Sequence, residues 1–173
     1  MNPNNMKENN KTNKLTNVLF IIYLIVLFWI LLFKLGVRFS YMENRNVNLL
    51  PFGKIDVAEI ILNVVIFVPL GIYAGVLFKR WGFVKKLFFF FVISLMFEGL
   101  QFIFRVGAFD ITDIITNVLG GLIGSLVFEA IQKLFNNSVR SQKFITIIAA
   151  IGTVLMISLL LLLKLNMLPI RYQ

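Results

Sequence analysis

The chain has 173 residues, of which 59% are hydrophobic and only 14% carry a charge. Soluble globular domains are about 25% charged, so this composition indicates an integral membrane protein. The formal net charge is +9, and the sequence contains neither cysteine nor histidine. Disulfides, thiolate nucleophiles, histidine-ligated metals and histidine-dependent catalytic pairs are therefore excluded. No basic run alternates with aromatic residues, so we expect no nucleic-acid partner, and we expect neither a metal nor another cofactor.

Apolar stretches of membrane-spanning length follow a polar amino-terminal segment. Residues 1–14 are rich in Asn and Lys and predict a disordered cytoplasmic tail, residues 15–165 a membrane domain, and residues 166–173 an external tail. A helix needs about 20 apolar residues to cross a bilayer. Such helices are predicted at about residues 15–35, 57–78, 87–105, 111–131 and 144–164. The predicted fold is an all-α, polytopic membrane helix bundle with five transmembrane helices.

The distribution of Lys and Arg near the helix ends predicts the orientation. With the amino terminus in the cytoplasm, ten of the 17 basic residues lie on the cytoplasmic side, including those of residues 79–86. Most acidic residues then lie on the outer side or in the outer half of a helix. We therefore predict a multi-pass protein of the cell membrane with a cytoplasmic amino terminus and an external carboxyl terminus. Residues 38–56 are then external.

Polar residues recur with one spacing inside the apolar segments. The sets are Asp56, Glu59 and Asn63, then Glu98, Gln101 and Arg105, then Asp110, Asp113 and Asn117. Each set has the spacing i, i+3, i+7, which places its members on one face of a helix. In the predicted topology all three sets lie in the outer-leaflet half, so we expect them to converge on one polar centre. Charge in hydrocarbon is costly and marks a functional site by default.

Helix-end chemistry is an alternative explanation for part of this pattern. Asp110 could cap its helix, Asp113 could interact with the positive amino end, and Arg105 could extend toward the headgroups. Glu98 lies about 10 Å deeper than Arg105, at 1.5 Å per residue. It must therefore be protonated, paired or exposed in a polar cavity. A ligand site and a structural polar network both stay open.

Two further features bear on this centre. Small residues four apart, at Gly71 and Gly75 and at Gly120 and Gly124, let helix backbones approach closely. Close approach of these two helices would bring Asn63 within reach of Asn117. The external segment contains Asn48, Pro51 and Phe52, which predict either an interfacial turn on the headgroups or a lid over the polar centre.

An ordered series of residues between about 45 and 130 is typical of one membrane-protein family. The series comprises Asn48-Leu49-Leu50-Pro51-Phe52, Asn63, Pro69-Leu70-Gly71, Ser94, Glu98, Gln101, Phe102, Arg105, Asp110, Asp113, Asn117, Gly120 and Gly124. With these residues the chain resembles the VanZ-like family of bacterial membrane proteins. The resemblance implies an association with low-level resistance to lipid-tailed glycopeptides such as teicoplanin. It implies a phenotype and not a reaction.

The preferred hypothesis is recognition of an amphiphilic envelope molecule at an outer-leaflet polar pocket. The partner would be membrane lipid, a lipid-linked wall precursor or a lipoglycopeptide. Arg105 would meet a phosphate or carboxylate; Asn63, Gln101 and Asn117 would supply amide hydrogen bonds; Glu98, Asp110 and Asp113 would orient Arg105 or hold a cation.

Two alternatives remain. In an intramembrane enzyme acting on a lipid-linked phosphate or sugar, Glu98, Asp110 and Asp113 are the candidate catalytic residues, as a general base or as ligands of a hard divalent cation. In a structural or assembly protein, the same residues only hold the helices together. Turnover of a polyprenyl lipid would favour the enzyme, and saturable binding without turnover would favour recognition.

Overall fold

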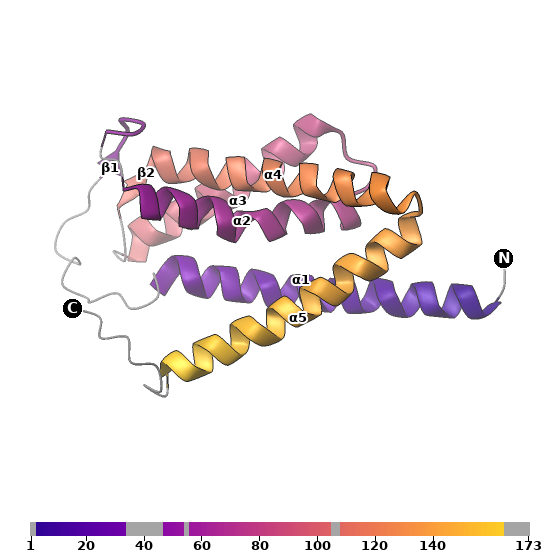
Figure 1. Cartoon of the computed structure of the whole chain (residues 1–173). Helices are drawn as coiled ribbons and strands as arrows, with labels where there is room; N and C mark the ends of the chain where they lie inside the picture. Colours follow the sequence, from indigo (N-terminus) through magenta and orange to yellow (C-terminus); the bar gives the residue numbers. More distant parts are fainter. Residues whose placement is uncertain (1–2, 34–46, 54–55, 105–107, 165–173) are drawn as a thin grey trace. The chain divides into compact units, whose positions relative to one another are not determined.

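The computed structural model describes residues 3–33, 47–53, 56–104 and 108–164. The helices are α1 (Pro3–Phe33), α2 (Val57–Leu77), α3 (Phe83–Phe104), α4 (Ile111–Phe135) and α5 (Ser138–Lys164), and two short strands are β1 (Val47–Asn48) and β2 (Phe109–Asp110) (Figure 1). The chain forms two compact units, Leu27–Lys133 and Met1–Val26 with Leu134–Gln173. We call them the central unit and the terminal unit. The predicted helical fold class is confirmed.

Four of the described helices are long and apolar enough to cross a membrane. They are Thr12–Ile30 within α1, and α2, α3 and α4 over their full lengths. The protein is therefore a membrane protein with several apolar helices. The fifth span, over residues 144–164, stays a prediction, because its last side chains lie outside the described part of the chain. The predicted external tail, residues 166–173, lies outside it as well.

The amino-terminal segment departs from the sequence-based expectation. Helix α1 begins at Pro3, whereas a disordered tail was predicted through residue 14. Once a helix is nucleated by its apolar residues, each further residue adds one hydrogen bond at little entropic cost, so the helix extends into a polar segment. Proline is also well tolerated at the first helical position, where no intrahelical N–H bond is needed. Composition alone did not capture this propagation.

Helices α2 and α4 of the central unit are parallel and in close contact. A Cβ atom added at Gly71 would lie 2.7 Å from Ser125 N and 2.8 Å from Gly124 Cα. A Cβ atom at Gly124 would in turn lie 3.0 Å from Gly71 Cα. Such separations are far inside van der Waals contact, so only glycine allows this approach of the two backbones. The role predicted for the small residues is confirmed.

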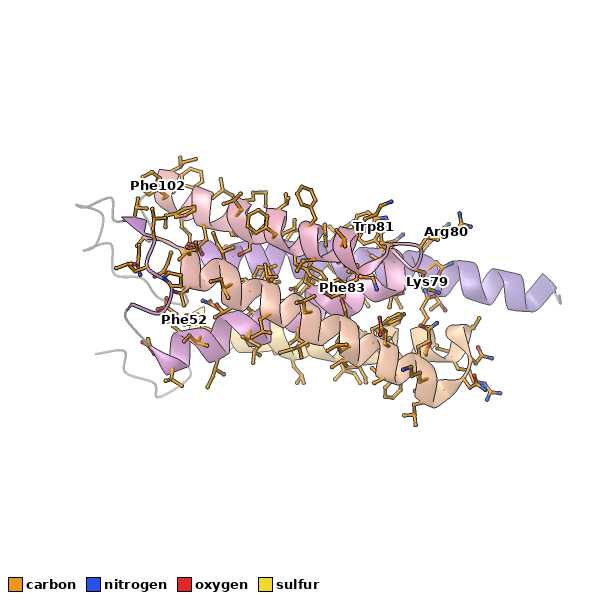
Figure 2. The ribbon with its side chains drawn as sticks, turned by 90° about the horizontal axis from the view of Figure 1, so that it is seen from above. Phe52, Lys79, Arg80, Trp81, Phe83 and Phe102 are labelled. Carbon is orange, nitrogen blue, oxygen red and sulfur yellow. The ribbon has the colours of Figure 1, made fainter. Side chains whose placement is uncertain are left out.

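Helix α3 runs antiparallel to α4. A Cβ atom at Gly121 would lie 2.6 Å from the ring of Phe90, and Asn117 is bonded to Ser94 further along α3. Residues with increasing numbers along α4 therefore contact residues with decreasing numbers along α3. The amino ends of α2 and α4 and the carboxyl end of α3 consequently share one end of the central unit. Figure 2 shows Phe52 and Phe102 at this end and Lys79 and Arg80 at the opposite end.

The terminal unit is joined by polar contacts between α1 and α5. Thr16 and Thr146 share a hydrogen bond of 2.8 Å between their hydroxyl oxygens, and Gln142 Nε2 donates to Asn13 Oδ1 at 2.6 Å. Buried hydrogen bonds of this kind hold helices together where the surroundings are apolar. The turn before α5 has Asn136 at a φ of 44°. Asparagine tolerates this left-handed conformation better than most residues.

Candidate ligand-binding site

Buried polar side chains gather where the amino ends of α2 and α4 meet the carboxyl end of α3. Each of the following is at most 8% exposed: Asn63, Ser94, Glu98, Gln101, Thr112, Asp113, Thr116 and Asn117. With half-buried Asp110 they form what we call the polar cluster. It contains side chains from all three helices that the sequence predicted. An apolar bundle buries so many polar groups only if they are hydrogen-bonded to one another or to a ligand.

Asn63 connects α2 to α4. Its Nδ2 donates to Asp113 Oδ1 at 2.8 Å, and both side chains are buried. The sequence predicts Asn63 within reach of Asn117, whereas its hydrogen bond goes to Asp113, one helical turn before Asn117. The approach to Asn117 itself stays a prediction. A hydrogen bond to a carboxylate is shorter and stronger than one to a neutral amide.

Asn117 instead faces α3. Its Nδ2 donates to Ser94 Oγ at 3.0 Å, and both residues are 0% exposed. Asn117 Oδ1 is buried and accepts no hydrogen bond within the part of the chain that the structure describes. A buried acceptor without a donor is costly, so this oxygen is suited to a ligand or water donor. Asn117 is thus the deepest cluster member on α4 with a free acceptor.

Glu98 is joined to α4 through the backbone. Its Oε2 accepts from Asp110 N at 3.1 Å, while the Glu98 side chain is only 1% exposed. Asp110 Oδ1 accepts from Thr112 N at 2.7 Å and so satisfies an amide of the first turn of α4. The capping role predicted for Asp110 is confirmed. Helix capping does not explain why Glu98 is buried, since Glu98 accepts from the backbone of the capping residue and does not itself cap α4.

The segment of residues 47–53, which we call the loop, is fastened to the amino end of α4. Strands β1 and β2 pair in parallel, with Asn48 aligned with Asp110. Asn48 Nδ2 donates to Asp110 Oδ2 at 2.8 Å, and Phe52 N donates to Thr112 Oγ1 at 3.0 Å. The loop therefore contacts two cluster members directly. The interfacial turn and the lid over the polar centre both stay predictions.

Three further predicted residues differ in outcome. Asp56 is exposed and accepts from Ala58 N and Glu59 N, so it caps α2 and does not belong to the polar cluster. Glu59 is only half-buried, one turn outside Asn63. The i, i+3, i+7 set of α2 thus contributes only Asn63 to the polar cluster, because Asp56 serves as the N-cap and Glu59 is half-buried. Arg105 lies outside the described residues.

The cluster also contains threonines that the sequence did not single out. Thr112 is 5% exposed and accepts from the loop, and Thr116 is 2% exposed and donates to the carbonyl oxygen of Thr112 at 2.9 Å. Threonine commonly bonds to its own helix backbone, so it gives no distinct sequence signal. The available indication in the sequence was that Thr112 and Thr116 each directly precede a predicted site residue. Among the described residues, no group of three or more acidic side chains is arranged to hold a metal ion.

Replacing Asn48 by aspartate is expected to release the loop from α4. The new carboxylate would face Asp110 Oδ2 where an amide now donates at 2.8 Å, so attraction becomes repulsion between like charges. Hydrogen exchange at residues 49–53 should become at least about tenfold faster, because a bond to a charged group is worth about 1.5–3 kcal/mol. Asn48→Ala should give a smaller acceleration. Unchanged exchange in Asn48→Asp would contradict the role of this bond.

The family of the chain follows from comparison with known proteins. The family model described as VanZ/LLP1 matches residues 20–136, which include all of the polar cluster and the loop. The chain belongs to the VanZ/LLP1 family. It is 40% identical to Protein VanZ of Enterococcus faecium over 151 residues, covering 84% of this chain and 91% of that relative. No solved structure matches.

Membership of the VanZ family confirms the resemblance drawn from the ordered series of motif residues. It associates the chain with resistance to teicoplanin-type glycopeptides, and it agrees with the apolar helices in making this a membrane protein. The matched residues extend from α1 to the end of α4 and thus contain the complete central unit. The polar cluster therefore lies within the part of the chain that the family model matches.

Proposed function

We propose that this VanZ family member binds an amphiphilic envelope molecule at the polar cluster and thereby lowers susceptibility to lipid-tailed glycopeptides. The ligand is a lipid-linked cell-wall precursor or the lipoglycopeptide itself. One observation carries the proposal: two carboxyl-bearing residues, Glu98 and Asp113, are buried at 1% and 8% exposure beside a loop with an apolar surface. Burial of charge needs compensation, and a polar head group entering this end of the bundle would add it.

The chemistry of the cluster fits the head of such a molecule. Carboxylates accept charge-assisted hydrogen bonds from the amide and hydroxyl groups of a sugar or peptide. Asp113 supplies a carboxylate from α4 and Asn63 an amide from α2, and the two are bonded to each other. Asn117 Oδ1 offers a buried acceptor. Arg105, which follows α3 in the sequence, is placed by the proposal against a phosphate or carboxylate. A planar guanidinium binds either group with two parallel hydrogen bonds.

The apolar surface of the loop fits the hydrocarbon tail of the proposed ligand. Leu49 is 63% exposed, Leu50 73% and Phe52 45%, so three large apolar side chains point away from the fold. Phe52 also has a φ of 58°, which a bulky residue adopts only when surrounding contacts impose it. The bond from Phe52 N to Thr112 Oγ1 is one such contact. The loop thus holds a rigid apolar tip next to the polar cluster, as a ligand with a polar head and a hydrocarbon tail requires.

The distribution of basic residues along the sequence supports an outward-facing cluster. In the predicted topology ten of the 17 basic residues lie on the cytoplasmic side, and Lys79, Arg80, Lys85, Lys86 and Lys133 among them lie at the end opposite the cluster. Basic residues are enriched on the cytoplasmic side of membrane proteins. We therefore place the polar cluster in the outer leaflet and the amino terminus in the cytoplasm. An outer-leaflet site is accessible both to wall precursors after export and to a drug arriving from outside.

Single cysteines test this orientation, because the chain has no cysteine of its own. Leu50→Cys should react with an impermeant thiol reagent in intact cells, since Leu50 is 73% exposed on the loop. Gly82→Cys, at the opposite end, should react only after the membrane is permeabilised. Labelling of Gly82→Cys in intact cells, with none of Leu50→Cys, would overturn the orientation and the outer-leaflet site together.

Binding to the reconstituted protein tests the function. The full chain in nanodiscs is titrated with a radiolabelled polyprenyl-diphosphate sugar and, separately, with labelled teicoplanin. The proposal predicts saturable binding of at least one of the two, competition by the unlabelled compound, and recovery of the ligand unchanged. Recovery of a converted lipid would instead establish the intramembrane enzyme. Absence of saturable binding by both would contradict recognition.

A further inference from the structure

A second charged surface lies at the opposite end of the central unit. Residues 78–86, which we call the basic turn, connect α2 to α3 and contain Lys79, Arg80, Lys85 and Lys86. The sequence has no acidic residue between Glu59 and Glu98. Lys79, Arg80 and Lys85 are exposed. Figure 2 shows Lys79, Arg80 and Trp81 at this end of the unit. Four positive charges therefore lie within eight residues, in a stretch of the sequence that contains no acidic residue.

An aromatic cluster fixes the shape of the basic turn. The rings of Phe78 and Trp81 are stacked with centroids 4.2 Å apart, and Phe89 packs edge-on against both at 5.5 Å and 5.8 Å. The backbone closes the turn through Trp81 N, which donates to Phe78 O at 2.9 Å. A turn held in this way presents its cations with little further loss of entropy on binding. Tryptophan is also enriched at the level of the lipid headgroups.

Apolar side chains continue from the basic turn along α3. Phe83 is 66% exposed, Val84 73% and Phe88 66%. Lys85 and Lys86 lie in the first turn of the same helix, which has no acidic residue there. The amino end of a helix carries a partial positive charge, so two lysines at this position are unfavourable without an external anion. The basic turn and the first turns of α3 thus combine cations, a tryptophan and exposed apolar side chains.

We propose that the basic turn binds the headgroup of an anionic phospholipid, whose acyl chains lie along Phe83, Val84 and Phe88. The phosphate is held by Arg80 and Lys85, and Trp81 lies at the headgroup level. The cations favour an anionic partner. The exposed apolar side chains beside them, on a helix long enough to span the membrane, favour a lipid as that partner. This inference does not depend on ligand binding at the polar cluster, which lies at the other end of the unit.

Fluorescence of Trp81 measures lipid selection directly. The chain has two tryptophans, so Trp29→Phe leaves Trp81 as the reporter. The purified full chain with this substitution is reconstituted in phosphatidylcholine vesicles with increasing fractions of brominated phosphatidylglycerol, and in a parallel series with brominated phosphatidylcholine. The concentration dependence of quenching gives the relative affinity for the anionic lipid. We expect a preference of roughly fivefold or more at low salt that declines as salt is raised.

Charge removal supplies the matched comparison. Arg80→Gln with Lys85→Gln should bring the relative affinity close to one. Lys133→Gln removes an exposed cation that follows Glu129 by one helical turn, and it should leave the preference unchanged. Equal quenching by the two brominated lipids in the reporter protein would overturn the proposal, whatever the variants do. So would an equal loss of preference in Lys133→Gln and in the double variant, because the basic turn would then have no special role.

Discussion

Replacing Gly124 by alanine is expected to lower the melting temperature of the purified protein in detergent by about 4–8 °C. The added Cβ would overlap the carbonyl group of Val68 and lie 3.0 Å from Gly71 Cα, so α2 and α4 must separate. Overpacking against backbone atoms costs up to about 3 kcal/mol, and the gain in helix propensity offsets up to about 1 kcal/mol of this, so the net loss is about 2 kcal/mol. In a chain of this length 1 kcal/mol corresponds to about 2–4 °C.

Gly99 provides the control for this substitution. It lies within α3, and a Cβ atom added there meets nothing within 4 Å. Gly99→Ala should therefore keep or slightly raise the melting temperature, because alanine favours the helix and displaces no neighbour. If Gly124→Ala melted at the temperature of Gly99→Ala, the close approach of α2 and α4 would be contradicted. The hydrogen bond from Asn63 to Asp113, which needs this close approach, would then lose its support.

Glu98→Gln is expected to abolish the resistance conferred by expression of the chain, while the variant still accumulates in the membrane. Glutamine keeps the size of the side chain and an oxygen that can accept from Asp110 N, now bonded at 3.1 Å. Only the charge is removed. Hydrogen bonds to charged groups contribute about 1.5–3 kcal/mol, so ligand affinity should fall about tenfold to a hundredfold.

The comparison for this variant is Glu129→Gln, which removes an exposed carboxylate at the far end of α4. It should retain full resistance. If Glu98→Gln were equally resistant, the carboxylate would be needed neither as a hydrogen-bond acceptor for the ligand nor as a counter-charge. Recognition by Glu98 would then be excluded, even though the side chain is buried.

The sequence predicted the convergence of α2, α3 and α4 because each helix imposes its own periodicity. Residues three, four or seven apart share a face whatever the tertiary structure, and the four residues Glu98, Gln101, Asp113 and Asn117 are all buried. The two pairs of glycines likewise identified the helices whose backbones touch. Buried polar residues in apolar helices are rare enough that their faces must turn inward.

Pairing across helices could not be predicted in this way. Helical faces alone do not show which of Asp113 and Asn117, one turn apart on α4, accepts from Asn63. The sequence also gave no reason to prefer capping over convergence at Asp56, since a carboxylate at a helix start serves either purpose. The parallel pairing of β1 with β2 is too short to leave a periodic signal.

The central claim is that the polar cluster is a ligand site and not only a structural network. Asp113→Asn tests it most directly, because the amide oxygen can still accept from Asn63 Nδ2, now bonded at 2.8 Å, while the charge is lost. Affinity for the labelled polyprenyl-diphosphate sugar and for teicoplanin is measured together with the melting temperature in detergent. We predict loss of saturable binding with a melting temperature within about 2 °C of the unsubstituted protein. Unchanged binding, or a large fall in melting temperature accompanying its loss, would contradict the account and leave a structural network in its place.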